Sequence, residues 1–164
     1  MGHEANPFLL QGLSYLDMVV HESLRLFPII TIERMCVKDY PVPGTKFTIP
    51  KGMIVGIANN AIMRDTRYFP DPDNFNPDVN FSAESKQKRS PYAFLAFGQG
   101  PRNCIGMRFA VLNMKMALIK MLGSYRVMAC DKTPTELIHE PTNPFSTPKG
   151  GTWVKVEKRK LGGS

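Results

Sequence analysis

The stretch of sequence that decides the fold is FGQGPRNCIG, residues 97–106, which leads at once into a largely apolar segment. Two glycines and a proline predict a tight loop, and Cys104 stands just before the expected start of a helix. Backbone N–H groups and the helix dipole at such a position favour a thiolate over a thiol. Arg102 adds a cation that suits bidentate contact with a carboxylate. The loop therefore combines an activated cysteine with an anion-binding side chain.

Each part of this loop has an ordinary alternative. A lone cysteine before a buried helix is more often an inert core residue, and two glycines without a following Gly-Lys-Ser/Thr do not make a phosphate loop. A thiolate with apolar neighbours such as Phe97 and Ile105 nevertheless has the chemistry of an axial haem ligand. The whole string is far more specific, because Phe-Gly-x-Gly-x-Arg-x-Cys-x-Gly is the haem-binding signature of the cytochrome P-450 family. The sequence resembles this signature at every fixed position.

This resemblance implies a mainly α fold with a small antiparallel β part, in which residues 1–164 form the C-terminal portion of a single domain. Cys104 would be the metal ligand, bound to the iron of haem b (iron protoporphyrin IX). Arg102 and Arg34 would bind the haem propionates, although Arg34 can equally be a surface arginine. The cofactor site implied by the family comprises Phe97, Arg102, Cys104, Ile105, Gly106, Ala110 and Arg34.

Glu22-Ser23-Leu24-Arg25 resembles the family's Glu-x-x-Arg helix motif, a structural lock beneath the haem. Taken alone, such a pair is an i,i+3 ion pair worth about 0.2–0.5 kcal/mol. In the family a third residue, an arginine of the meander, completes a triad. In FNPDVNF, residues 75–81, Val79 stands where that arginine is expected. Asn80 can supply a hydrogen bond in its place but no charge.

Two further segments match family segments that line the substrate pocket. For the isoleucines of the first segment, the alternative is a simple strand core. The residues concerned are Ile29, Ile30, Thr31 and Ile32, and then Asn143, Pro144, Phe145 and Ser146.

Hydrophobic spacing predicts a helix over residues 14–27, with Ser14 as its cap and Asp17 in a capping-box position. A second helix, over residues 106–122, is expected to be largely buried, with its polar side chains on one arc. Between them, residues 29–57 form a β region in which Pro50-Lys51-Gly52 is expected to turn a hairpin. The polar arc of the second helix comprises Arg108, Asn113, Lys115 and Lys120.

The meander, residues 69–96, shows no sustained period, and its aromatic residues predict a loop pinned to the core. Either Asn59 or Asn60 is expected to cap a short helix before it. The C-terminal strands, within residues 125–157, are expected at 125–129, 136–139 and 152–156.

The chain has 164 residues, a hydrophobic fraction of 43% and a formal net charge of +7. This composition excludes wholesale disorder, and its charge fits nucleic acid, an anionic membrane or an acidic protein. Nucleic-acid binding is not expected, because the cations are dispersed and no groove-reading motif is present. Arg108 and the basic residues 86–89 are expected on a basic face, with ordinary solvated charge as the alternative. Together with the family resemblance, the positive net charge favours an acidic reductase as the protein partner. The three cysteines form no CxxC pair, which favours a reducing compartment.

Three segments are most similar in sequence to microsomal animal enzymes that metabolise xenobiotics: YLDMVVHESLRLFP, IPKGM and FGQGPRNCIGMRFA. The resemblance implies insertion of one oxygen atom from O₂ into a small apolar organic substrate. NADPH would supply electrons through a reductase, with cytochrome b5 as a further candidate partner, at the cytoplasmic face of the endoplasmic reticulum membrane. A reductase-independent peroxide isomerase or dehydratase, or a non-catalytic haem-binding fragment, are the alternatives. The membrane anchor and the distal acid–alcohol pair are expected to lie outside these residues.

Overall fold

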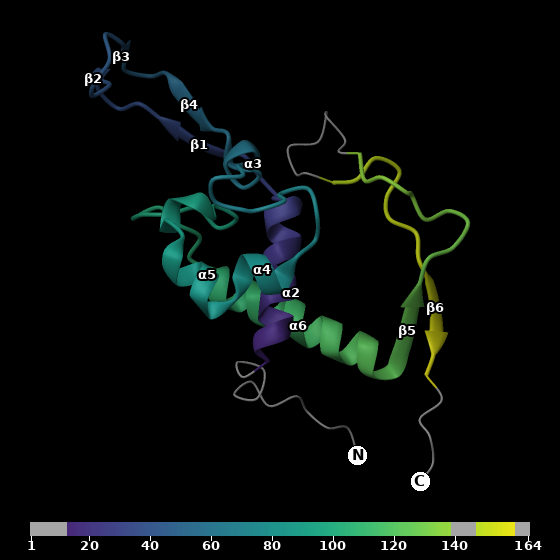
Figure 1. Cartoon of the computed structure of the whole chain (residues 1–164). Coiled ribbons are helices and arrows are strands. Elements are labelled where there is room, and N and C mark those ends of the chain that lie inside the picture. Colours follow the sequence, from purple (N-terminus) through teal and green to yellow (C-terminus); the bar gives the residue numbers. More distant parts are fainter. Residues whose placement is uncertain (1–12, 139–146, 160–164) are drawn as a thin grey trace.

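The computed structural model describes residues 13–138 and 147–159, which form a small helical body with two β arms (Figure 1). The fold is mainly α with small antiparallel sheets, as predicted. The helices of the body are α2 (Ser14–Leu26), α3 (Asn59–Ile62), α4 (Pro77–Phe81), α5 (Ala83–Lys88), the 3₁₀ helix η1 (Pro91–Ala93) and α6 (Met107–Ser124).

Helix α2 begins at the predicted residue and ends one residue before the predicted end, but its N-terminus is not capped as expected. Leu13 is the N-cap residue, and no side chain caps the helix. The Asp17 carboxylate instead bonds Lys115 of α6 at 2.6 Å and Lys86 of α5 at 3.1 Å. These two ammonium groups hold the Asp17 carboxylate away from the helix end. Asp17 thereby links α2 to α5 and α6.

The first β arm is built from two nested ladders. Strand β1 (Ile32–Met35) pairs antiparallel with β4 (Ile54–Ile57), and β2 (Tyr40–Pro41) pairs with β3 (Thr48–Ile49). A turn does occur at Pro50-Lys51-Gly52, but the expected hairpin across it is wrong. The strands on either side of this turn pair with earlier partners, so the turn passes the chain from the β2–β3 ladder to the β1–β4 ladder.

The meander contains more regular structure than predicted, since α4, α5 and η1 lie within it. Its attachment to the core is confirmed by the cluster of Met63, Phe69, Phe81 and Ala93, all buried. Phe75 and Tyr92 are exposed and take no part. Short helix α3 precedes the meander at the expected place, with Ala58 as its N-cap instead of an asparagine side chain.

Helix α6 was expected to be largely buried, and that prediction is wrong within the described chain. Lys115 is its one buried residue, whereas Phe109, Met121 and Leu122 are exposed. Figure 1 shows the reason: α6 crosses α2 near its own N-terminal half and then runs outward to the second β arm. The described residues cover only one side of this apolar helix.

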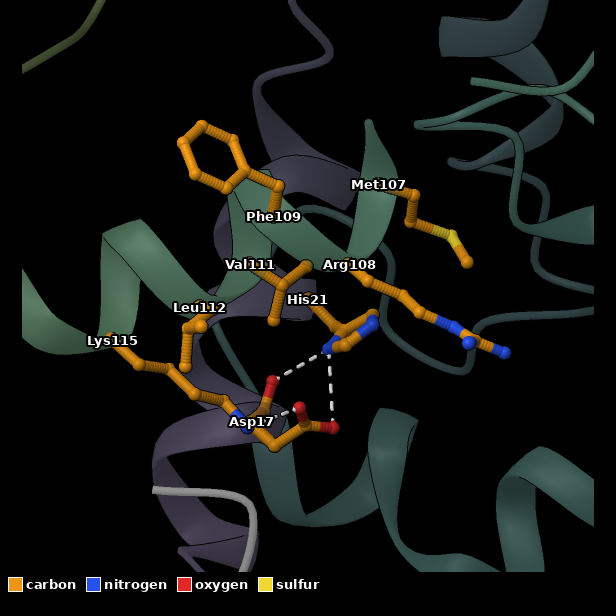
Figure 2. Close-up of a pocket in the computed structure, with 8 residues that line it drawn as sticks. All are labelled: Asp17, His21, Met107, Arg108, Phe109, Val111, Leu112 and Lys115. Atoms are coloured by element: carbon orange, nitrogen blue, oxygen red, sulfur yellow. Dashed lines mark hydrogen bonds and ion pairs between the residues drawn. The ribbon is translucent and has the colours of Figure 1, made fainter. Parts of the chain in front are cut away.

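The predicted polar arc of α6 is wrong at one residue, Lys115, which is buried. This side chain does not face solvent with Arg108, Asn113 and Lys120, but turns inward onto Asp17 (Figure 2). Burial tends to raise the pKa of Asp17, but Lys115, His21 and Lys86 outweigh it, so the pKa lies below its usual value. The Asp17–Lys115 contact is thus a charge-assisted link between α2 and α6.

We expect Lys115→Met to reduce the free energy of unfolding by about 1–2 kcal/mol, because a hydrogen bond between charged groups is lost while Asp17 keeps its other partners. Urea denaturation of the natural-length protein measures the change. The matched control is Lys120→Met on the exposed face of the same helix. Equal losses in the two variants would show that Lys115 acts only as a surface residue.

The second β arm pairs β5 (Tyr125–Met128) with β6 (Lys155–Lys158), antiparallel. The strands predicted over 125–129 and 152–156 are thereby found with shifted bounds. No strand forms over residues 136–138, so that prediction is wrong for them; His139 lies outside the described residues. The nearby Lys149 N–H bonds the Ile138 carbonyl oxygen at 2.7 Å, a loop contact.

Candidate functional site: a cysteine loop supported by a buried ion pair

The loop of residues 97–106 is shaped by two glycines with left-handed backbone. Gly98 has φ +71° and Gly100 has φ +81°, conformations that L side chains rarely adopt. The Cys104 N–H donates to the Phe97 carbonyl oxygen at 2.8 Å, and the Asn103 N–H donates to Gly100 at 3.1 Å. The backbone alone therefore closes the loop and fixes the place of Cys104.

Cys104 is exposed and lies just ahead of α6. The helix begins at Met107 with Gly106 as its N-cap, and the Met107 N–H reaches the Cys104 carbonyl oxygen at 3.4 Å. The thiol is therefore presented from the loop that precedes the helix, two residues before the cap. Such a position leaves the sulfur open to a ligand.

Strand β1 lies against this loop and brings the two candidate propionate-binding arginines near each other. The Arg34 guanidinium Nη2 donates to the Arg102 carbonyl oxygen at 3.3 Å, although the two residues are 68 positions apart. Both residues are exposed. An exposed cysteine, an arginine two residues before it and a second arginine bonded to the backbone of the first suit a planar cofactor with two carboxylates and a metal, so the residues present fit haem.

The apolar candidates around the loop are unevenly placed. Ile105 is fully exposed, whereas Phe97, Gly106 and Ala110 are half-buried. A Cβ added to Gly98 would lie 3.9 Å from Cδ1 of Ile32, so the start of β1 contacts the loop. Ile29, Ile30 and Thr31 are exposed on the segment that leads into β1. Asn143, Pro144, Phe145 and Ser146 lie outside the described residues.

We expect Gly98→Ala to destabilise the protein by about 1–2 kcal/mol, because its left-handed backbone is costly for a residue with a Cβ. Space is not the cause, since the nearest atoms to the added Cβ are at ordinary contact distance. Gly123→Ala, inside α6, is the control and should instead raise stability by about 0.5–1 kcal/mol. Urea midpoints of both variants measure this, and a neutral Gly98→Ala would contradict the assigned loop geometry.

Glu22 and Arg25 form a fully buried ion pair on α2. Arg25 Nε donates to Glu22 Oε2 at 2.7 Å, and Nη2 donates to Oε1 at 2.9 Å. Both side chains have 0% exposure, far from the surface i,i+3 pair that was the ordinary alternative. A buried charge is costly unless a partner neutralises it. The structure therefore brings together the two residues predicted to form the lock.

The remaining donors of Arg25 hold three backbone carbonyls of distant segments. They reach the oxygens of Met63 at 3.0 Å, Pro72 at 2.7 Å and Asn74 at 3.1 Å. Arg25 also lies over the ring of Phe69, 5.1 Å from its centroid. One side chain thereby fixes the meander to α2, which explains how a motif on one helix stabilises a loop 40 to 50 residues away.

The meander returns two hydrogen bonds to Glu22. The Asn76 N–H and the Asn80 side-chain amide each donate to Oε1 at 2.9 Å. Burial raises the pKa of Glu22, but Arg25 and these two donors outweigh it, so the pKa lies below its usual value. Val79 is exposed. Asn80 therefore occupies the place beside Glu22, and the hydrogen bond expected of it is present.

One member of this cluster, Arg89, was not predicted from the sequence. It was expected on a solvated basic face, but its guanidinium lies 4.4 Å from the ring centroid of Phe69 and 4.8 Å from that of Phe81. Its Nη1 donates to the Asn80 carbonyl oxygen at 2.6 Å. The neighbours Lys86 and Lys88 are exposed as predicted. No local sequence pattern distinguishes Arg89 from the neighbouring cations. Its contact with the rings of Phe69 and Phe81 is what distinguishes it.

A cleft of about 610 Å³ lies between α2 and the N-terminal half of α6 (Figure 2). Asp17 and His21 line it from α2, and Met107, Phe109 and Lys115 belong to its α6 wall. Figure 2 shows Phe109 turned away from the Asp17–His21 pair. Cys104 does not line this cleft, so the cleft and the cysteine loop are separate features.

Comparisons with known proteins agree with the motifs. A family model described as Cytochrome P450 matches residues 8–156. "Cytochrome P450 3A17" of Cavia porcellus is 43% identical over 144 residues, which cover 84% of this chain and 28% of the relative. "Cytochrome P450 3A13" of Mus musculus is 45% identical over 140 residues, or 81% and 27%. "Lithocholate 6-beta-hydroxylase" of Mesocricetus auratus is 42% identical over 144 residues, or 84% and 28%.

The matches cover most of this chain but less than a third of each relative. The family match includes α2, the cysteine loop and α6, all within the matched residues 8–156. The chain spans between a quarter and a third of the length of the curated relatives it matches. The loop signature, the buried Glu22–Arg25 pair and the family match lead to one conclusion: the chain belongs to the cytochrome P450 family.

Proposed function

We propose that the whole protein is a haem-thiolate monooxygenase that inserts one oxygen atom from O₂ into a small apolar organic substrate. The observation that carries this proposal is the loop that exposes Cys104, with Arg102 two residues before it and the Arg34 guanidinium bonded to the Arg102 carbonyl oxygen. A haem held by a thiolate supplies oxygen activation, because the thiolate donates electron density that favours O–O cleavage. The family and its mammalian relatives support the same class of reaction.

In this proposal the residues of the chain hold and orient haem b. The Cys104 sulfur would bind the iron, and Arg102 and Arg34 would bind the propionates. Phe97, Ile105, Gly106 and Ala110 flank the cofactor. Glu22 and Arg25 keep the loop in place by holding the meander to α2, so their role is structural and lies outside the chemistry.

The substrate wall on this chain is proposed to begin at residues 29–32. Support comes from Ile32, whose side chain lies beside the glycine turn of the cysteine loop, and from the exposed apolar side chains of Ile29 and Ile30. Asn143 to Ser146 are proposed as a second edge on the basis of the family resemblance. One relative is named Lithocholate 6-beta-hydroxylase, so hydroxylation of lithocholate is the reaction to test first.

We propose that electrons come from NADPH through a reductase, with cytochrome b5 as a second donor. The net charge of +7 supports an acidic partner. Within residues 13–138 and 147–159, no helix has the length and apolar character that a membrane span requires. We infer from the family resemblance that the whole protein works at the cytoplasmic face of the endoplasmic reticulum membrane. The exposed apolar side of α6 is then expected to pack against other parts of that protein.

Isotope labelling tests the reaction. The natural-length, haem-loaded protein is given NADPH, a reductase and lithocholate under ¹⁸O₂, with a panel of other apolar organic substrates in parallel. The proposal predicts products that carry one labelled oxygen atom and form only when the reductase is present. Conversion of organic peroxides without reductase, with no labelled product from any substrate, would instead support the isomerase or dehydratase. No conversion of either kind would contradict catalysis.

A further inference from the structure

The buried cluster around Glu22 holds a second arginine with a definite place. Arg89 follows α5 directly as its C-cap residue, and its side chain turns inward onto Phe69 and Phe81. The Phe69 ring is shared, because the Arg25 guanidinium lies 5.1 Å from the same centroid. Two guanidinium groups thus meet at one buried ring, an arrangement that is unfavourable unless an anion compensates both charges.

Glu22 is the anion available to both arginines. Arg25 is hydrogen-bonded to Glu22 directly. Arg89 is connected to Glu22 through Asn80, whose side-chain amide donates to Glu22 and whose backbone carbonyl oxygen accepts from Arg89. The pKa of Arg89 reflects this position: burial lowers it, and the negative charge of Glu22 opposes the decrease. The cluster therefore contains one carboxylate, two guanidinium groups and a neutral amide between them.

We propose that Arg89 is the positioning residue that supplies the positive charge of the missing meander arginine, with Asn80 supplying its hydrogen bond to Glu22. The role of a single arginine is thereby divided between two residues, one on α4 and one at the end of α5. Arg89 is nine positions after Asn80, so the same interaction also fixes the segment between α4 and η1.

That segment leads to the cysteine loop, and two hydrogen bonds support the connection. The residue after Arg89, Ser90, caps η1 by accepting from the Tyr92 N–H at 3.3 Å. The Gln99 side chain then donates to the Pro91 carbonyl oxygen at 3.1 Å. Arg89 is thus placed to hold η1 against the core and, through Gln99, to hold the loop that carries Cys104. This last step rests on the proposed function.

The test compares Arg89→Lys, which keeps the charge, with Arg89→Gln, which keeps a hydrogen-bond donor and removes the charge. Both are made in the natural-length, haem-loaded protein. The readouts are the thermal midpoint by circular dichroism and the half-life of the thiolate-type carbon monoxide absorbance. Lys88→Met is the matched control, because Lys88 is the adjacent cation and pairs only with exposed Glu84.

We expect Arg89→Gln to shorten the half-life of the thiolate-type absorbance about tenfold and to lower the thermal midpoint, because an interaction between charged groups is lost. Arg89→Lys should retain most of both, and Lys88→Met should match the unmodified protein. An unchanged Arg89→Gln, or an Arg89→Lys that loses as much as Arg89→Gln, overturns the proposal. If Arg89→Gln does not fold, a folded Arg89→Lys supports the role of the charge and an unfolded one contradicts it.

The two proposals fail in different ways. If the unmodified protein shows no thiolate-type absorbance, the proposed haem-thiolate function fails, and the thermal midpoints still decide whether the charge of Arg89 stabilises the cluster. If the absorbance is normal and the variants do not differ, only the role of Arg89 is overturned.

Discussion

Cys104→Ala is expected to abolish substrate oxidation by the natural-length protein, with a loss of more than about 100-fold. Groups that merely support metal ligands already cost 10- to 100-fold when removed, and Cys104 is proposed as the ligand itself. The variant should still fold, because Cys104 is exposed and its backbone N–H bond to Phe97 does not need the thiol. Turnover per folded protein and haem content measure the effect.

The other two cysteines provide the controls. Cys36 is half-buried and its thiol lies 2.9 Å from the Lys38 carbonyl oxygen, while Cys130 lies beside Thr133 in a loop near the second β arm. Neither lies on the cysteine loop, so Cys36→Ala and Cys130→Ala should retain most activity. If Cys104→Ala retained activity equal to that of these controls, the proposed ligand would be wrong.

Arg25→Met is expected to be the most destabilising single substitution considered for this chain, at about 3–5 kcal/mol, because it leaves the Glu22 carboxylate buried without its main partner. It also frees the carbonyls of Met63, Pro72 and Asn74, which depend on the same guanidinium. For a protein of ordinary stability this loss is a large part of the whole. Urea denaturation, or the yield of folded protein, measures it.

Two variants make this prediction specific. Adding Glu22→Gln to Arg25→Met removes the stranded charge and should recover part of the loss. Arg67→Met removes an exposed arginine that pairs with Asp65 and should leave stability nearly unchanged. Equal tolerance of Arg25→Met and Arg67→Met would contradict the buried pair as the fastening between α2 and the meander.

The cysteine loop is the part of the site that the sequence predicts best. Gly98 and Gly100 are needed for left-handed backbone, and the hydrogen bond from Cys104 to Phe97 closes within ten residues. All of this is local, so a short motif contains the information. The same holds for α2, whose bounds follow from its own hydrophobic spacing.

Features that depend on distant partners were predicted poorly. The turn at residues 50–52 was correctly located, but the pairing of β1 with β4 and of β2 with β3 depends on strands outside that turn. Lys115 and Arg89 are ordinary cations in the sequence. Their burial is decided by Asp17 in one case and by two phenylalanine rings in the other. Periodicity carries no information about such partners.

The apolar character of α6 was recognised, but its burial was not predicted correctly. Within the described residues the helix packs against α2 on one side and leaves Phe109 and Met121 exposed. Hydrophobicity around a whole helix shows that it can be buried on every side; what covers each side depends on other segments. The exposed face of α6 is consistent with a chain that matches less than a third of the length of its relatives.

The most direct test of the account is the absorbance of the carbon monoxide complex formed by the reduced, haem-loaded protein. We expect a thiolate-type absorbance in the natural-length protein that disappears in Cys104→Ala and persists in Cys36→Ala and Cys130→Ala. A thiolate-type absorbance that survives in Cys104→Ala, or that is missing from the unmodified protein, would contradict Cys104 as the axial ligand.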